Sequence, residues 1–158
     1  MIPKPKKNRR SKRQIARKGA TLVEAAITLP LMLWILLSML DLGLAAVRFN
    51  ALAEAARRVC RQAIIHGQDA GEITSAWGPE AYEATAATAS PMVAPAATAI
   101  PTMAPDEVSI RIAWPDGDNA PRDRVETQLQ YTHEPLLSGL MPWGPFQLDA
   151  SCTMSIVN

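Results

Sequence analysis

One uncharged stretch limits what this chain can fold into more than any other feature of its sequence. From Ala25 to Leu40 there are 16 residues without a charge, and with Asp41 as the one interruption the apolar stretch continues to Val47. Its 23 residues suit a helix that crosses a bilayer, which needs about 20 mostly apolar residues. We therefore predict a membrane span at about residues 25–47.

Two other kinds of apolar helix compete with this interpretation. A buried core helix would need more surrounding chain than a protein of 158 residues with a strongly basic flank provides. An ordinary secretory signal has an apolar core of only about 7–15 residues before a cleavage site of small residues, and the only such site here is near Ala45–Ala46. Both explain the length of the stretch less well than a membrane span does.

The charge of the chain is divided unevenly around this stretch. Residues 1–19 hold nine of the 16 Lys and Arg residues and no acid, so residues 20–158 sum to −8 although the whole chain is only +1. Basic residues beside a span stay in the cytoplasm, which predicts an inner-membrane protein with its N-terminus inside and its C-terminal part exported. A basic run can also bind nucleic acid, but here topology and contact with anionic membrane lipid explain it better. We expect no nucleic-acid partner.

The junction between the basic leader, residues 1–19, and the apolar stretch has a specific order of residues. From Arg17 to Glu24 the sequence is RKGATLVE, so Gly19 follows the basic residues and Glu24 stands five positions after the Gly. This order resembles the prepilin-type signal, which a prepilin peptidase cuts directly after the Gly on the cytoplasmic side. The resemblance implies a cut between Gly19 and Ala20 that leaves the apolar helix on the mature protein.

Glu24 is unusual because a carboxylate within an apolar helix is costly and generally has a partner. A cut after Gly19 would create a new α-amine on Ala20, about one helical turn away. In pilin-like assemblies a Glu at this place is thought to pair with the N-terminal amine of a subunit, which gives Glu24 an assembly role. The alternative, that Glu24 simply lies at the level of the lipid headgroups, stays open.

The helical pattern continues beyond the apolar stretch. Apolar residues recur there at steps of three and four, which predicts one amphipathic face. These residues are Phe49, Leu52, Ala53, Ala56, Val59, Cys60, Ala63 and Ile64. Gly67 provides a stop, so we predict one long helix over residues 20–66.

The remainder predicts a small antiparallel sheet. Residues 67–106 are rich in Ala, Thr and Pro, which favours a connector, with a short helix around Pro79–Thr88. Apolar and polar residues then alternate around 108–114, 125–131 and 146–156, which is typical of three strands with one buried face each. We predict an α+β fold in which residues 107–158 form an exported antiparallel β region covered by the amphipathic part of the helix.

The two cysteines fall on faces that should meet. Cys60 lies on the apolar face of the helix and Cys152 on the apolar side of the last strand. Outside the cytoplasm a disulfide between them is favoured, and two buried free thiols are the alternative.

The sequence gives no sign of catalysis. His66 and His133 have no neighbouring Cys, Asp or Glu at metal-ligand spacing. Asp116, Asp118 and Asp123 lie in a turn-rich segment but lack the spacing and terminal Glu of a Ca²⁺ loop. We expect no enzyme activity, no cofactor and no metal.

Taken together, the residues over about 17–66 resemble the TadE-like family of tight-adherence (Flp) pilus systems. The resemblance rests on the junction Arg17–Glu24, Leu29-Pro30-Leu31, Asp41-Leu42-Gly43, Asn50-Ala51-Leu52 and Ala55-Ala56-Arg57. It implies a minor pseudopilin or pilus-assembly component that is a substrate of a prepilin peptidase and has other pilus or pseudopilin subunits as partners. The alternatives are an anchored exported binding protein outside any pilus, and a pseudopilin of a type II-like secretion machine.

Overall fold

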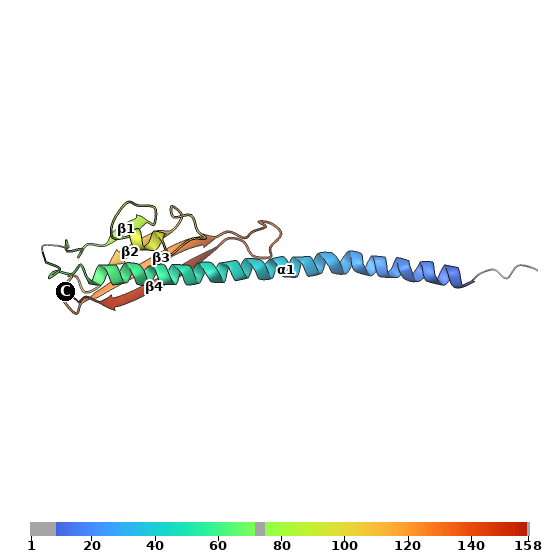
Figure 1. Ribbon diagram of the computed structural model, residues 1–158, viewed down its shortest axis with the longest axis horizontal. Coiled ribbons are helices and arrows are strands. Elements are labelled where there is room, and N and C mark those ends of the chain that lie inside the picture. The colour runs from blue at the N-terminus through green and yellow to red at the C-terminus, as the bar shows by residue number, and fades with distance from the viewer. Residues whose placement is uncertain (1–8, 72–74, 158) are drawn as a thin grey trace, which may run out of the picture. The chain divides into compact units, whose positions relative to one another are not determined.

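The computed structural model describes residues 9–71 and 75–157, with side chains from residue 21 onward. The elements in chain order are α1 (Arg9–Ile64), β1 (Tyr82–Thr85), α2 (Ala94–Ala97), β2 (Ser109–Ala113), β3 (Arg124–His133) and β4 (Phe146–Ser155) (Figure 1). The chain divides into two compact units, the first ending at Leu40 and the second beginning at Asp41. The predicted α+β class is confirmed.

Helix α1 begins earlier than the sequence predicted and ends slightly sooner. It starts at Arg9, within the basic leader, and ends at Ile64. The early start follows from the leader's Arg, Lys, Gln and Ala residues, which are strong helix formers. The difference at the C-terminal end, two residues, is within the usual fraying of a helix terminus.

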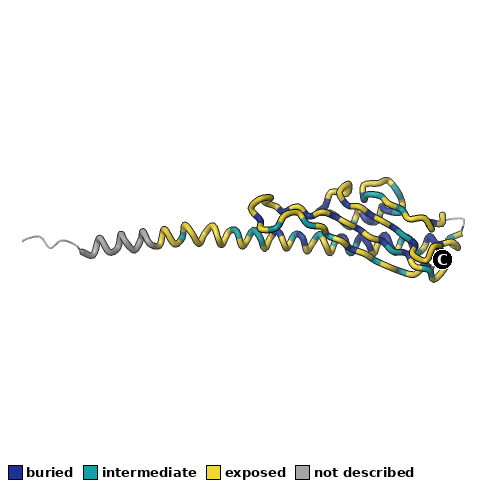
Figure 2. Tube along the Cα trace, turned by 180° about the vertical axis from the view of Figure 1, so that it is seen from behind, coloured by how far each residue is buried: buried dark blue, intermediate teal, exposed yellow. Residues whose placement is uncertain are grey.

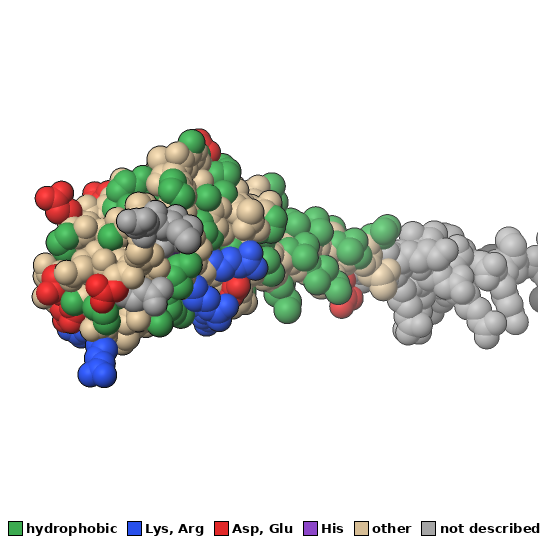
Figure 3. Space-filling view, turned by 60° about the vertical axis from the view of Figure 1, so that its left-hand side comes forward, with side chains coloured by type: hydrophobic (Ala, Val, Ile, Leu, Met, Phe, Trp, Pro, Cys, Tyr) green, Lys and Arg blue, Asp and Glu red, His purple; other side chains and the backbone are tan. Residues whose placement is uncertain are grey.

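The part of α1 from Thr21 to Leu40, which we call the anchor segment, has no apolar partner within its own unit. Its large apolar side chains, from Leu22 to Leu40, are mostly exposed (Figure 2), and hydrophobic atoms dominate its surface (Figure 3). Helix Thr21–Ile64 is long and apolar enough to cross a membrane, with a mean hydropathy of 2.0 in its most apolar window and none of that window buried. An uncovered helix that is uncharged and mostly apolar from Ala25 to Leu40 is typical of a membrane span, which supports a single-pass anchor.

The part of α1 from Asp41 to Ile64, which we call the packed segment, buries one face in the second unit. The buried residues are Asp41, Ala45, Leu52, Ala55, Ala56, Val59, Cys60 and Ala63. The predicted amphipathic face is therefore present and begins two turns earlier, at Asp41. Phe49 was wrongly assigned to it, because 46% of its surface is exposed on a flank of the helix that the sheet does not cover.

The sheet has the order β1-β2-β3-β4 and is antiparallel throughout. Its buried side is formed by alternate residues of the predicted strands, among them Ile110, Ile112, Val125 and Leu129, and this side joins the packed segment in one core. The alternation that predicted three strands is confirmed, since side chains of a strand point to opposite faces in turn.

The fourth strand, β1, lies where the sequence suggested a short helix. Tyr82–Thr85 pairs with β2, with Tyr82 opposite Ile112 and Thr85 opposite Ser109. The helix expected around Pro79–Thr88 was wrong because pairing with an existing strand outweighed the helix preference of Glu and Ala in this segment. The connector also buries Val93, Ala96 and Ile100 in the core, so part of it packs on the sheet domain.

Candidate functional site

The predicted cleavage junction lies within helix α1. Gly19 and Ala20 are helical in backbone, and their surroundings lie outside the residues whose side chains are described. Glu24 is exposed, and its backbone carbonyl accepts a hydrogen bond from Thr28 Oγ1 at 2.9 Å. Among residues 21–71 and 75–157, no side chain pairs with the carboxylate of Glu24. This carboxylate is therefore available for a partner from elsewhere.

Asp41 is the one fully buried acid among the described residues. Its side chain is fully buried, and both oxygens accept hydrogen bonds from the β3–β4 loop, residues 134–145. The backbone N–H of Leu136 donates to Oδ1 at 2.8 Å, and the indole N–H of Trp143 donates to Oδ2 at 2.9 Å. Because hydrogen bonds to a buried charge are strong, Asp41 fixes this loop to the first turn of the packed segment.

His133 and Arg48 complete this arrangement. Arg48 Nη1 donates to His133 Nδ1 at 3.0 Å, so Nδ1 is an acceptor and the ring proton is on Nε2. That nitrogen lies 3.5 Å from Asp41 Oδ1, too long for a good hydrogen bond, and the ring is fully buried. The Arg48 guanidinium also lies 5.4 Å from the centre of the Tyr131 ring. We call Asp41, Arg48, His133 and Trp143 the Asp41 cluster.

The Asp41 cluster balances the buried negative charge of Asp41 with the positive charge of Arg48, and the His133 ring lies between them. A buried charge without such compensation would be strongly destabilising. Asp41 and Arg48 are seven residues apart, about two helical turns, and so share one face of α1. His133 is the last residue of β3 and continues its buried alternation. The cluster therefore joins the helix, the end of the sheet and the β3–β4 loop.

Sequence analysis did not find this cluster, although one signal pointed to it. Asp41 is the only charge in residues 25–47, and an acid in an apolar helix generally has a partner. The partner could not be identified because His133 and Trp143 are more than 90 residues away in the sequence. Their meeting depends on the register between β3 and β4, in which His133 lies opposite Phe146.

The two cysteines are neighbours in the structure, as free thiols. Cys60 Sγ lies 3.6 Å from the carbonyl oxygen of Cys152 and 3.7 Å from that of Val125. Burial raises the pKa of the Cys60 thiol to about 12, and the neighbouring Cys152 adds to the shift. Cys60 is thus a poor nucleophile at neutral pH. The predicted faces do meet, while the disulfide itself stays a prediction.

The acidic turn before β3 is held by an arginine. Asp116 accepts from Arg124 Nη2 at 2.6 Å and from the Arg124 backbone N–H at 2.8 Å, and these bonds lower the pKa of Asp116 to about 2. The neighbouring Asp118 instead raises the pKa of Asp123. Within the described parts of the chain, no group of three or more His, Cys, Asp or Glu residues is arranged to hold a metal ion. The turn is therefore built around an ion pair.

His66 has a structural position at the end of α1. Its ring stacks on Trp77 with 3.8 Å between ring centres, and its Nδ1 lies 2.8 Å from the carbonyl oxygen of Gln62. Asn119 Nδ2 in turn donates to the carbonyl of Trp77 at 2.8 Å. These contacts join the helix end to the connector and to the turn after β2.

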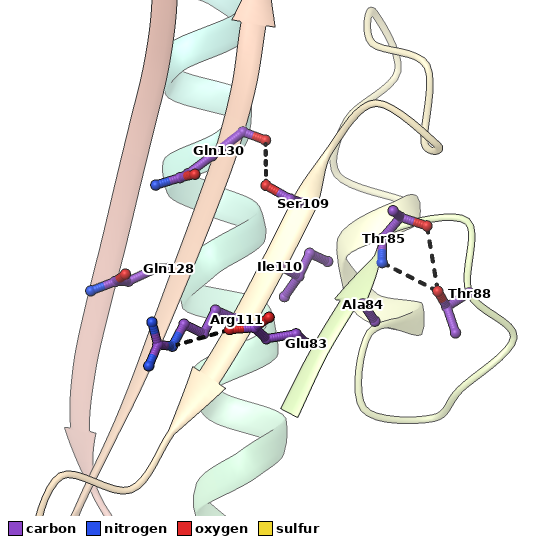
Figure 4. Close-up of a pocket in the computed structure, with 9 residues that line it drawn as sticks. All are labelled: Glu83, Ala84, Thr85, Thr88, Ser109, Ile110, Arg111, Gln128 and Gln130. Atoms are coloured by element: carbon purple, nitrogen blue, oxygen red, sulfur yellow. Dashed lines mark hydrogen bonds and ion pairs between the residues drawn. The ribbon is translucent and has the colours of Figure 1, made fainter. Parts of the chain in front are cut away.

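A shallow hollow of about 520 Å³ lies on the outer side of strands β1 to β3 (Figure 4). Its one ion pair joins Arg111 Nε to Glu83 Oε1 at 3.7 Å, with both side chains largely exposed. The remaining lining is formed by Ala84, Thr85, Thr88, Ser109, Ile110, Gln128 and Gln130. It contains neither Cys nor His, so it has no Ser–His or Cys–His pair for covalent catalysis.

One family model matches part of the N-terminal half of the chain. The model of the TadE-like protein family matches residues 19–61. The match begins at the predicted cleavage Gly, covers the whole anchor segment and extends through most of the packed segment. The resemblance predicted from the sequence is confirmed over these residues. No curated protein and no solved structure matches the chain.

Proposed function

We propose that this chain, TadE-like over residues 19–61, is a membrane-anchored minor pseudopilin. It would act as a structural or assembly component of a tight-adherence (Flp-type) pilus or a related secretion system. The observation that carries the proposal is the extent of the family match, which starts at Gly19 and includes the apolar helix. The chain would then act through helix–helix and helix–lipid contacts of its anchor rather than through catalysis.

The anchor segment accounts for the membrane attachment. Its 20 residues, Thr21–Leu40, span about 30 Å at 1.5 Å per residue, the thickness of a hydrocarbon core. Since Asp41 and Ala45 are buried by protein, the lipid-embedded part would end at Leu40, short of the Val47 limit set by hydropathy. A periplasmic reporter fused after Asn158 should be active, because the nine basic leader residues keep the N-terminus inside. Activity of a cytoplasm-only reporter at that point would refute this topology.

Processing by a prepilin peptidase is the sharpest test of the proposal. Cleavage after Gly19 would change the side-chain charge of the chain from +1 to −8. Gly19 also weakens the helix locally, since Gly costs about 1 kcal/mol relative to Ala in a helix, which would help a peptidase to bind the chain in an open form. N-terminal sequencing of membrane-extracted protein should start at Ala20, and Gly19→Val should leave the full-length chain.

Gly43→Val is the matched control for this experiment. Gly43 lies in the same helix, and a Cβ added there meets nothing within 4 Å, so this variant should be cut as efficiently as the native chain. Wild-type protein that starts at Met1 in cells with an active prepilin peptidase would contradict the pseudopilin assignment. It would favour an anchored exported binding protein instead.

Glu24 would act after cleavage, by pairing with the Ala20 amine of a neighbouring subunit. Its carboxylate is exposed and has no partner among the described side chains, which is the state that such pairing requires. Glu24→Ala should therefore be cut normally but should no longer co-purify with the other pilus subunits. Glu24→Gln keeps the shape without the charge and should fail in the same way. Normal co-purification of both variants would leave Glu24 with only an interfacial position.

Export would allow Cys60 and Cys152 to form a disulfide. Their closeness supports this, and a bond closing a loop of about 90 residues would nominally contribute about 4–5 kcal/mol through the unfolded state. Intact mass of protein from the envelope should be two hydrogens below the reduced value, with Cys152→Ser as the control that lacks the difference. Alkylation of both thiols without prior reduction would refute the disulfide.

A further inference from the structure

The β3–β4 loop presents a group of apolar side chains on the surface of the second unit. Leu136, Leu137 and Leu140 are 57%, 40% and 54% exposed. No charged residue occurs between Glu134 and Asp149. Single exposed leucines are ordinary, but three within a short uncharged run of the loop indicate an interaction surface.

This loop is held in place. Asp41 accepts from the N–H groups of Leu136 and Trp143, and the side chain of Met141 is buried. Within the loop, the backbone N–H of Leu140 donates to the carbonyl of Leu137 at 3.1 Å. The leucines are therefore exposed by an ordered structure, which lowers the entropy lost when they bind a partner.

The position of Asp41, which holds the loop, indicates that the partner of the leucines is the membrane. Asp41 follows Leu40 directly, and on the proposed function Leu40 is the last residue within the hydrocarbon core. A loop bonded to Asp41 is thus attached at the level where the chain leaves the bilayer. Leu42, the residue after Asp41, is also about half exposed, so the second unit has a further apolar side chain beside the point where the chain enters it.

We propose that Leu136, Leu137 and Leu140 insert into the periplasmic leaflet of the membrane that holds the anchor segment. The inference rests on the proposed function, since it needs the anchor to be in the membrane. Residues 135–145, which hold the three leucines, carry no charge, and the exposed Glu134 lies at the β3 end of the loop, where it would stay at the level of the headgroups. The indole N–H of Trp143 is already satisfied by Asp41, so its ring can lie among lipid. The sheet domain would then have a second point of attachment to the bilayer.

Spin labels on the full-length chain test this directly. Leu137→Cys, Ala87→Cys and Leu31→Cys would each be made in a chain carrying Cys60→Ser and Cys152→Ser, and reconstituted in vesicles of phosphatidylcholine and phosphatidylglycerol. Ala87 is exposed in the connector and serves as the water control, whereas Leu31 lies in the anchor segment. The ratio of collisions with oxygen to collisions with a water-soluble nickel chelate should be several-fold higher at 137 than at 87.

The outcomes distinguish failure of the loop insertion from failure of the membrane anchor. A lipid-like label at 31 with a water-like label at 137 would refute the loop insertion alone, and a water-like label at 31 would refute the membrane anchor and the insertion with it. A label at 137 whose dipolar broadening disappears when unlabelled chain is added would show contact with a second copy, which also overturns the proposal.

A second measurement keeps the native cysteines and so guards against misfolding of the cysteine-free chain. Benzoylphenylalanine placed at position 137 of the otherwise native chain should form adducts with the mass of a phospholipid on illumination. The same group at position 87 should not. Adducts with a second copy at 137, or no lipid adduct there, would overturn the insertion.

Discussion

The two parts of helix α1 have the same backbone conformation and opposite surroundings. The anchor segment, Thr21–Leu40, exposes large apolar side chains on all sides, whereas the packed segment, Asp41–Ile64, buries one face against a sheet and exposes arginines on the other. A helix that is apolar all round and one that is amphipathic differ in what can cover them, lipid in the first case and protein in the second. The change occurs at one residue, Asp41.

The comparison shows how a single acid can mark a boundary. Between Ala25 and Leu40 the helix carries no charge, and the described side chains of the first unit offer no buried polar partner for one. In the packed segment the Asp41 carboxylate is satisfied by Leu136 and Trp143, with the Arg48–His133 pair nearby. The surface of the helix therefore changes from uncovered and apolar to partly buried where the sheet domain first supplies polar partners. Variants that change one segment of the helix and leave the other native can test this division at Asp41.

The largest difference is expected from truncating a buried leucine. Leu52 is fully buried in the core of the second unit, so Leu52→Ala should lower the free energy of unfolding of the sheet domain by about 2–5 kcal/mol. Leu33→Ala, in the exposed anchor segment, should leave that free energy unchanged. Urea unfolding in detergent micelles, followed through the buried Trp77 and Trp114, measures both. Equal destabilisation by the two variants would contradict the division of the helix.

A charge placed in the helix should have the opposite distribution of effects: it should impair the anchor segment and leave the packed segment unaffected. Leu33→Arg places a guanidinium within the anchor segment and should cost about 3 kcal/mol in membrane insertion, roughly a hundredfold in the insertion equilibrium. Phe49→Arg, at a half-exposed site of the packed segment, should insert normally. Carbonate extraction of membranes separates inserted from peripheral protein. Loss of insertion in both variants would move the end of the span beyond Leu40.

Much of this architecture could be predicted because it is encoded locally. The apolar run of residues 25–40 predicts a helix long and apolar enough to cross a membrane, and the alternation in Val108–Trp114 and Val125–Tyr131 predicts strands. Strand β1 could not be predicted, because Tyr82–Thr85 is a strand only through its pairing with Ser109–Ile112. The burial predicted for Phe49 was wrong for a similar reason. Periodicity indicates the face of the helix on which a residue lies, but not how far the sheet covers that face.

The candidate sites likewise divide into those encoded by local sequence and those that depend on tertiary contacts. Gly19, Ala20 and Glu24 were predicted from a local motif, and the closeness of Cys60 and Cys152 from the faces on which they lie. The Asp41 cluster was missed because its partners come from the distant β3–β4 loop and from the end of β3. Their positions depend on tertiary register, which a pattern of local residues does not contain.

A smaller effect is expected when the boundary acid is neutralised. Asp41→Asn keeps the size of the side chain but replaces one acceptor oxygen by an NH₂ group, so one of the loop's hydrogen bonds is lost inside the protein. The domain should lose about 1–3 kcal/mol, and the β3–β4 loop should be cut faster by chymotrypsin after Leu136 or Leu140. Asp149→Asn, at an exposed site on β4, is the control. Unchanged proteolysis would show that Asp41 does not hold the loop.

The smallest effect concerns acid, which should act on the sheet domain and leave the anchor segment in the membrane. Because Arg124 lowers the pKa of Asp116 from its ordinary 3.8 to about 2, the pair stabilises the folded state fully above about pH 4. That contribution is lost as the pH falls through 2. Asp116→Asn should therefore lower the urea midpoint modestly at pH 7 and show a weaker loss of stability between pH 4 and pH 2. The effect should shrink in high salt, since the pair is exposed.

Asp118→Asn is the matched control in the same turn. It removes the neighbour that raises the pKa of Asp123, so it should not lower stability at pH 7 and should keep the acid response of Asp116. An Asp116→Asn variant with the native midpoint and the native acid response would show that the ion pair contributes nothing to the domain.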